Sequence, residues 1–396
     1  MKVFIIAGEQ SGDKLGGALM AGLKSLRPDM TFDGVGGPLM QAEGFVSRFP
    51  MDELSVMGLA EILPKYRALK ARIRQMADAI ISNPPDLLIT IDSPDFCLRV
   101  AKLVKAATSV RTVHYVAPTV WAWRPGRAAK MARHIDHVLA LFPFEPPLMR
   151  AAGMACDFVG HPVVAEPVAS ADDAAAFRQT YNIGEGPLIL ALPGSRRGEV
   201  SRLAERFGAA LGQVAQQYPT APVVVPCAAP VAALVRELTS TWPVRPILLD
   251  PTAGSTSAEK RAAFKAADVA LAASGTVSLE LAAHATPMVI AYDMAPISRF
   301  IISRMLRVDT VTLVNLVSET RTIPEYIGKA CESAAIADGL LGVLADPTAQ
   351  LAAMSTTMDR LGRGGEAPGL RAARAVLASY EAAIKDHQTN GQNAKA

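Results

Sequence analysis

Two aspartates follow an apolar run in the first quarter of the chain. Residues 91–96 read Ile-Asp-Ser-Pro-Asp-Phe, so Asp92 and Asp95 stand just beyond a predicted buried strand, where the active sites of α/β proteins gather. Transfer of a group to an alcohol needs a base, because an unassisted hydroxyl is a weak nucleophile at neutral pH. Asp92 is the first candidate for this base and Asp95 the second. A capping or turn role is the alternative for both.

A second strand-turn-helix pattern carries a cation. Residues 190–200 read Leu-Ala-Leu-Pro-Gly-Ser-Arg-Arg-Gly-Glu-Val, which places Gly194, Ser195 and Arg196 where a helix begins. The positive end of a helix dipole together with a guanidinium suits a diphosphate. We prefer Arg196 to Arg197 because it is nearer the turn. The alternative is a surface arginine beside a helix cap.

A third turn, Ser274-Gly275-Thr276, also lies between a predicted strand and a helix, with Glu280 one turn into that helix. Small residues leave room for a ligand, and a carboxylate can accept hydrogen bonds from the two hydroxyls of a ribose. A glutamate that only favours the helix dipole is an equal alternative.

The first turn of the chain is rich in glycine but matches neither common nucleotide motif. Residues 8–17 have the spacing G-x-x-x-G-x-x-x-G-G, which differs from G-x-G-x-x-G and from the P-loop pattern. Gly8 and Gly12 would still let the backbone approach a ligand at a helix N-terminus. A plain tight turn is the alternative.

Aromatic residues gather after another predicted strand. Residues 114–124 hold His114 and two of the three tryptophans, Trp121 and Trp123. They could form a platform for a sugar, anchor a loop, or simply pack in the core. His114 and His161 are candidates for lining a site rather than for acting as bases.

A basic amphipathic helix is predicted from Leu59 to Ile81. Such a helix can lie on an anionic membrane surface, although a helix packed on its own domain with a solvated basic face is about as common. The residues predicted to contact a membrane are Leu59, Ile62, Leu63, Tyr66, Arg67, Leu69, Lys70 and Ile73.

Parallel strands wound with helices must position these residues. Short apolar runs followed by turns and helical patterns occur in two series, separated by a polar joint over 166–185. This predicts an α/β protein of two doubly wound, Rossmann-like domains facing a central cleft. We expect domains at 1–165 and 166–355, helices at 356–384 that cross back to the first domain, and a disordered tail at 385–396.

Composition narrows the function classes. The 396 residues carry a net charge of only +3, which argues against a nucleic-acid partner. The four cysteines lack C-x-x-C spacing, which argues against a disulfide framework or a zinc site. The uncharged stretch 207–235 contains glutamines and prolines that do not suit a membrane span. We therefore expect a cytosolic protein that touches a membrane from one side.

Ten sequence blocks in one order resemble the lipid-A-disaccharide synthases, glycosyltransferase family 19, from near Val3 to about Val317. They are AGEQSGDKLGG, GVGGPLMQAEGF, ELSVMGLAEIL, TIDSPDFCLRVA, HYVAPTVWAWRPGR, FPFEPPL, FVGHP, LPGSRRGEV, ASGTVSLELA and TLVNLV. The resemblance implies a glycosyltransferase B fold and an inverting transfer of 2,3-diacylglucosamine from UDP to 2,3-diacylglucosamine 1-phosphate. The product is a β-1,6-linked disaccharide.

The resemblance also assigns roles. The essential acid falls on Asp92 and the essential arginine on Arg196. Glu280 and Asn315 would contact the UDP part, and Ser11 with its neighbouring glycines would line the sugar side. Gln10, where relatives often carry alanine, leaves the sugar contacts open. No cofactor or metal is implied, in keeping with the lack of a D-x-D pattern. The implied location is the cytoplasmic face of the inner membrane of a Gram-negative cell, and a homodimer is left open.

Three other functions compete with this interpretation. A UDP-N-acetylglucosamine 2-epimerase would use a similar pair of domains but would convert the nucleotide sugar alone. An NAD-dependent oxidoreductase is disfavoured by the missing G-x-G-x-x-G. A binding protein without turnover would retain the sites and form no product.

Overall fold

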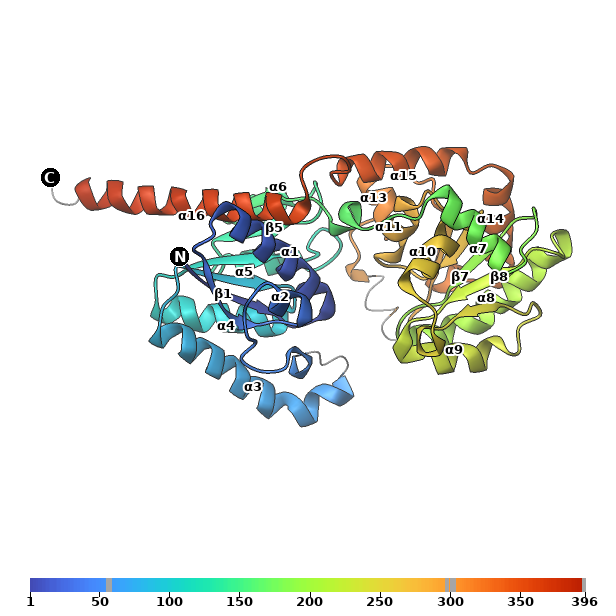
Figure 1. Ribbon diagram of the computed structural model, residues 1–396. Coiled ribbons are helices and arrows are strands. Elements are labelled where there is room, and N and C mark those ends of the chain that lie inside the picture. The colour runs from blue at the N-terminus through green and yellow to red at the C-terminus, as the bar shows by residue number, and fades with distance from the viewer. Residues whose placement is uncertain (55–58, 296–298, 300–303, 394–396) are drawn as a thin grey trace. The chain divides into compact units, whose positions relative to one another are not determined.

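The computed structural model describes residues 1–54, 59–295, 299 and 304–393, with the backbone alone described for 59–66 and 386–393. The chain divides into two compact units. The first comprises Met1–Ala165 and Gly364–Ala396, and the second comprises Glu166–Arg363. Figure 1 shows that each unit is a sheet packed between helices.

The first unit is built on a parallel sheet of six strands within its described residues, in the order β2-β1-β3-β4-β5-β6. The central strands β1, β3, β4 and β5 are almost continuously buried, as expected where helices cover both faces, whereas the edge strands β2 and β6 are partly exposed. The order reverses between β1 and β3: the chain passes from β1 to β2 at one edge of the sheet, and then from β3 towards β6 at the other edge. The strands are β1 Lys2–Ala7, β2 Thr31–Val35, β3 Leu87–Ile91, β4 Arg111–Tyr115, β5 His137–Ala140 and β6 Ala155–Phe158. The helices are α1 Gln10–Leu26, α2 Pro38–Ala42, α3 Leu59–Ser82, α4 Pro94–Ala107, α5 Gly126–Met131, α6 Pro146–Ala151 and α16 Pro368–Asn393.

The second unit repeats this plan. Its described residues form a parallel sheet in the order β12-β11-β10-β7-β8-β9, and here the order reverses between β10 and β7. Two doubly wound sheets therefore confirm the predicted fold class. The strands are β7 Ile189–Leu192, β8 Val223–Pro226, β9 Ile247–Leu249, β10 Val269–Ala272, β11 Met288–Tyr292 and β12 Glu325–Ile327. The helices are α7 Ala171–Thr180, α8 Arg197–Gln217, α9 Ala232–Thr239, α10 Ser257–Ala266, α11 Val277–Ala283, α13 Leu313–Ser318, α14 Ser333–Ala345 and α15 Thr348–Arg360.

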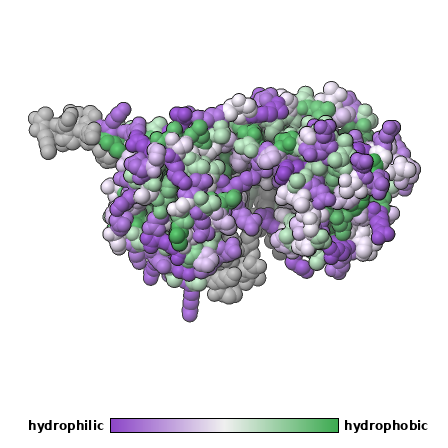
Figure 2. Space-filling view, in the orientation of Figure 1, coloured by the Kyte–Doolittle hydropathy of each residue, from purple (hydrophilic) through white to green (hydrophobic). Residues whose placement is uncertain are grey.

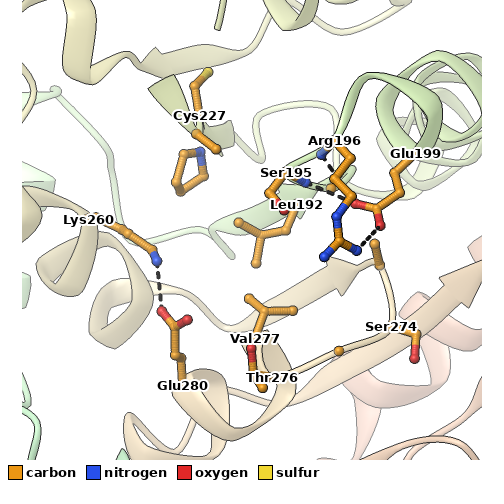
Figure 3. Close-up of a pocket in the computed structure, with 15 residues that line it drawn as sticks. Leu192, Ser195, Arg196, Glu199, Cys227, Lys260, Ser274, Thr276, Val277 and Glu280 are labelled. Atoms are coloured by element: carbon orange, nitrogen blue, oxygen red, sulfur yellow. Dashed lines mark hydrogen bonds and ion pairs between the residues drawn. The ribbon is translucent and has the colours of Figure 1, made fainter. Parts of the chain in front are cut away.

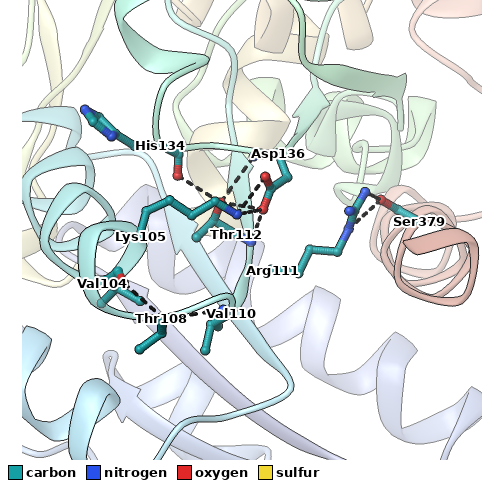
Figure 4. Close-up of polar contacts among 9 residues, drawn as sticks. All are labelled: Val104, Lys105, Thr108, Val110, Arg111, Thr112, His134, Asp136 and Ser379. Carbon is teal, nitrogen blue, oxygen red and sulfur yellow. Dashed lines mark hydrogen bonds and ion pairs between the residues drawn. The ribbon is translucent and has the colours of Figure 1, made fainter. Parts of the chain in front are cut away.

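The last helix, α16, belongs to the first unit, which the chain rejoins at Gly364 rather than at residue 356. Arg111 on β4 donates hydrogen bonds from Nε (3.3 Å) and Nη2 (2.7 Å) to Ser379 Oγ on α16, as Figure 4 shows. The helix continues to Asn393. The disorder predicted for residues 385–396 stays a prediction.

Figure 4 also shows a polar network at the amino end of β4. Asp136 accepts hydrogen bonds from Lys105 Nζ at 2.6 Å and from the backbone N–H of Thr112 at 2.9 Å. These bonds hold the pKa of Asp136 below its ordinary value against the opposing effect of burial. The network ties α4 to β4 and β5 at the end of the sheet remote from the strand carboxyl ends, so we assign it a structural role.

Helix α3 corrects part of the membrane prediction. Ile73 is buried in the core, 5% exposed, so it cannot meet lipid. Leu69 is half-buried, whereas Arg67 and Lys70 are exposed. The side chains of Leu59, Ile62, Leu63 and Tyr66 lie outside the described residues.

The visible surface is mixed in polarity. Figure 2 shows hydrophilic and hydrophobic residues interspersed over the visible face of each unit. Among the described helices, none has both the length and the apolar content needed to cross a bilayer.

Candidate active site

A pocket of about 430 Å³ lies in the second unit, between the carboxyl ends of β7 and β10 where the strand order reverses. Ligands of doubly wound sheets bind at this position. All the residues predicted at the second and third turns, 194–196 and 274–276, line it together with Glu280 (Figure 3). The lining comprises Leu192, Gly194, Ser195, Arg196, Glu199, Pro226, Cys227, Ala228, Lys260, Ala273, Ser274, Gly275, Thr276, Val277 and Glu280.

The β7–α8 turn forms one wall of the pocket. Gly194 has φ +120°, and a Cβ there would lie 2.6 Å from Glu199 Cβ, so the turn requires glycine. Arg196 precedes the first residue of α8, and its side chain is 64% exposed. Helix α8 therefore directs its N-terminal dipole at the pocket beside a guanidinium, which is an arrangement that binds anions.

Glu199 occupies the hydrogen-bond donors of this turn. Its Oε2 accepts from the backbone N–H groups of Ser195 (3.1 Å) and Arg196 (3.3 Å), and its Oε1 lies 3.2 Å from Arg196 Nη1. Glutamate at the third position of a helix commonly binds back to the cap in this way. Glu199 lies within the pattern at residues 190–200 but was not among the predicted site residues.

A second ion pair lines the pocket. Lys260 on α10 places its Nζ 2.7 Å from Oε2 of Glu280 on α11. Figure 3 shows this pair on the opposite side of the pocket from Arg196 and Glu199. Lys260 was missed, because it lies in the middle of a helix and belongs to no turn motif.

The third predicted turn leaves open space. Gly275 has φ +138°, and a Cβ added to it would meet nothing within 4 Å. Its carbonyl oxygen accepts a hydrogen bond from Ser278 Oγ at 2.9 Å, which fixes the start of α11. Ser274 and Thr276 flank this opening in the pocket wall.

Asn315 is the exception among the UDP-side predictions. It is buried in α13, where Nδ2 donates to Thr310 Oγ1 (3.3 Å) and Ile323 O (3.0 Å), and Oδ1 accepts from Ile323 N (3.0 Å). The structure does not bring Asn315 to the pocket lining, and its amide already serves to hold the segment before β12.

Asp92 and Ser93 stand at the reversal point of the first sheet, just after β3. Both have left-handed backbone angles, φ 49° and 43°, which are strained for residues other than glycine and cluster at functional sites. Burial raises the pKa of Asp92 above the ordinary 3.8, and a hydrogen bond from the Ser93 backbone N–H partly offsets this. A partly buried, strained carboxyl group is a suitable general base.

The glycines of the first turn serve packing. Gly8 is buried, and a Cβ there would lie 2.5 Å from Ser93 Oγ, so the ends of β1 and β3 are in close contact. Gly12 is also buried, and a Cβ there would lie 3.5 Å from the Ile91 carbonyl oxygen. It packs α1 onto the sheet, so its predicted ligand contact is not supported. Ser11 and Asp95 are exposed.

The two candidate histidines are core residues. His114 is 2% exposed on β4, with Nδ1 2.8 Å from Thr90 Oγ1, and burial lowers its pKa to about 4. His161 accepts from the backbone N–H of Val163 at Nδ1, and burial, followed by the charge of Lys14, lowers its pKa to about 4. Both rings are neutral at pH 7, and the prediction that they line a site is not supported.

The aromatic segment is a loop with an unexpected anchor. Trp121 Nε1 donates to Oε1 of Glu145 at 3.3 Å, and Glu145 Oε2 accepts from the backbone N–H groups of Leu141 and Phe142. Burial raises the pKa of Glu145 to about 7. Trp123 is half-buried and donates to Thr119 Oγ1 at 3.0 Å. Trp121 therefore anchors the loop, and both tryptophans are half-buried.

Comparison with known proteins adds the family. The model of the family described as lipid-A-disaccharide synthetase matches residues 3–367. Lipid-A-disaccharide synthase of Ruegeria pomeroyi is 63% identical over 380 residues, 95% of each chain. The enzyme of the same name from Rhodospirillum centenum is 45% identical over 381 residues, 95% of this chain and 94% of its own.

The similar solved structures have low sequence identity and show only that the fold is shared. UDP-GlcNAc 2-epimerase from Neisseria meningitidis bound to UDP-GlcNAc superposes with a TM-score of 0.60 at 12% identity, over 97% of this chain and all of that one. Anabaena HepE in complex with UDP-glucose gives a TM-score of 0.54 at 13% identity, over 96% of this chain and all of that one. Both support the two-domain glycosyltransferase B architecture. With the match to the family model and relatives of 63% and 45% identity, the chain belongs to the lipid-A-disaccharide synthase family.

Proposed function

We propose that this protein transfers a 2,3-diacylglucosaminyl group from UDP to 2,3-diacylglucosamine 1-phosphate, making a β-1,6-linked disaccharide with inversion at the anomeric carbon. The observation that carries the proposal is the pocket at the reversal point of the second sheet, in a chain of this family. Its walls offer a cation and a helix N-terminus for a diphosphate and a carboxylate for a ribose.

The donor is held by the second unit. Arg196 and the backbone of the β7–α8 turn bind the diphosphate, and Glu280 binds the ribose hydroxyls. The exposure of the Arg196 guanidinium and its place at the start of α8 support this role. As the bond between the anomeric carbon and UDP breaks, negative charge grows on the diphosphate. Loss of one such stabilising donor typically costs about 3 kcal/mol, on the order of a hundredfold in rate.

Asp92 is the base. The 6-hydroxyl oxygen of the acceptor attacks the anomeric carbon from the face opposite UDP, its proton passes to the Asp92 carboxylate, and UDP leaves with the bonding electron pair. The strained backbone and partial burial of Asp92 support its choice over the exposed Asp95. The sugar passes through an oxocarbenium-like transition state, as in other glycosyl transfers.

The test is an assay with purified protein, UDP-diacylglucosamine and the 1-phosphate acceptor, followed by mass analysis of the lipid. We expect a disaccharide 1-phosphate that requires both substrates. Conversion of the nucleotide sugar without acceptor would instead indicate an epimerase. Asp92→Asn should abolish transfer while UDP binding persists, and near-normal turnover of this variant would reject Asp92 as the base.

We also propose that the protein binds the cytoplasmic face of the inner membrane through α3. Exposed Arg67 and Lys70 support this, because basic side chains are attracted to anionic lipid. Flotation with vesicles of phosphatidylglycerol should recover the protein at low salt. The double variant Arg67→Glu with Lys70→Glu should float less, and equal flotation of the two proteins would exclude this contact.

A further inference from the structure

We infer that Lys260 is a positioning residue that sets the specificity of the pocket for a ribonucleotide: by holding one oxygen of Glu280, it presents the other oxygen to the ribose hydroxyls of the donor. The inference deepens the proposed function and rests on it. Neither the turn motifs nor the expected contacts of Glu280 single out this lysine.

Lys260 contacts only one of the two carboxylate oxygens of Glu280 in the described structure. Lys260 Nζ lies 2.7 Å from Glu280 Oε2. Within the described part of the chain, Oε1 of Glu280 has no hydrogen-bond donor, so that oxygen is available to a ligand in the pocket that both residues line. A carboxylate fixed at one oxygen presents the other in a defined direction. Such a defined direction is needed to distinguish a ribose, with its two hydroxyls, from a 2′-deoxyribose, which has one.

The ammonium itself is also held in place. Lys260 Nζ lies 5.0 Å from the centroid of the Phe264 ring, one turn further along α10, which is within the range of a cation–π contact. Lysine side chains are otherwise mobile, and these two contacts restrict this one. The pair is therefore organised before any ligand arrives.

Stability does not explain the pair. The side chains of Lys260 and Glu280 are 41% and 35% exposed, and ion pairs of such exposure contribute little to folding. Their position is more informative. They face the Arg196 side across the pocket, so a nucleotide whose diphosphate is bound by Arg196 can extend its ribose toward Glu280 (Figure 3).

The principal rival is that Lys260 binds the diphosphate directly. Lysine is a common phosphate ligand, acting as a point charge. The two roles predict different results, because an ammonium bound to phosphate does not sense whether the sugar carries a 2′-hydroxyl. A positioning residue that acts through Glu280 does.

The experiment is calorimetric titration of the full-length protein with UDP and with 2′-deoxy-UDP. For the unsubstituted protein we expect UDP to bind about tenfold more tightly, the value of one hydrogen bond to a charged group. Lys260→Met should reduce this ratio to about twofold, and Lys260→Arg should restore most of it. Lys265→Met, on the same helix but not lining the pocket, is the matched control and should keep the full ratio.

Two results would overturn the inference. One is an unchanged ratio in Lys260→Met. The other is an equal loss of affinity for both nucleotides, which would assign Lys260 to the diphosphate. Circular dichroism and thermal melting of each variant identify any that fail to fold. Failure of the proposed function is separate, because it would show as a lack of disaccharide product from the unsubstituted protein with both substrates.

Discussion

Glu199 lies against Arg196 in the pocket of the second unit, with Oε1 of the carboxylate 3.2 Å from Nη1 of the guanidinium. The same carboxylate accepts hydrogen bonds from the backbone N–H groups of Ser195 and Arg196. These are the donors that a diphosphate needs. If the donor binds as proposed, the glutamate is an internal anion that the nucleotide must displace or share.

Replacement of Glu199 by glutamine should tighten the binding of UDP about threefold, because an amide oxygen can still cap the turn but does not repel a diphosphate. Titration calorimetry at low salt measures this. Glu205→Gln, at an exposed position on the same helix, is the control for a change of charge alone. Weaker binding by Glu199→Gln would mean that the carboxylate is needed to hold the turn in its binding form.

The pH dependence of transfer should report Asp92. Burial raises its pKa above 3.8, and a base must be deprotonated to act. Activity should therefore rise with pH through a midpoint above 3.8 and level off at higher pH. Measurement of kcat/KM between pH 4 and 8 gives the midpoint, with circular dichroism to show that the protein stays folded.

Asp95→Asn is the matched control, since Asp95 lies three residues further on and is exposed. It should keep the acidic limb of the profile, whereas Asp92→Asn should lack measurable transfer. If Asp95→Asn loses transfer and Asp92→Asn retains it, the roles of the two acids are reversed.

The sequence predicted the elements that form the pocket because each leaves a local signal. Strands β7 and β10 are continuous apolar runs, and the turns that follow them contain Gly194 and Gly275 at positive φ. Strands β2 and β12 leave no such signal. Both lie at sheet edges, where Thr31–Val35 includes Asp33 and Gly34 and Glu325–Ile327 is only three residues long. Neither has the apolar run that marks a central strand.

Contacts between side chains that are far apart in the sequence could not be predicted from a local pattern. Lys260 reaches Glu280 from another helix, and Glu145 reaches Trp121 across a loop. The burial of His114 could not be predicted for a related reason. Strand β4 is buried on both faces, so alternation along the strand does not tell which side chains face the core and which approach the site.

Cys227 offers a test of pocket occupancy that does not depend on turnover. It lines the pocket and is partly exposed, whereas Cys97, Cys156 and Cys331 are buried. Burial raises the pKa of Cys227 to about 11, so its alkylation by iodoacetamide should be slow at pH 7 and accelerate about tenfold per pH unit toward that value.

At pH 9, saturating UDP should slow the alkylation of Cys227 severalfold, as followed by mass spectrometry of the intact protein. Cys227→Ser should show no fast modification. Uridine without phosphate should protect less, because it lacks the groups that Arg196 would bind. Equal labelling with and without UDP would argue that the nucleotide binds elsewhere.

The return of α16 to the first unit depends on backbone contact between two helices. A Cβ on Gly369 would lie 2.6 Å from the carbonyl oxygen of Ala18 on α1, and a Cβ on Gly22 would lie 2.8 Å from the carbonyl oxygen of Gly369. Backbone atoms cannot move aside as a flexible side chain can.

Gly369→Val should therefore destabilise the protein by about 1–3 kcal/mol and expose α16 to limited proteolysis. Ala378→Val, at an exposed position on the same helix, should cost only about 0.5 kcal/mol through helix propensity. Equal melting temperatures for the two variants would mean that α16 is not held by this contact.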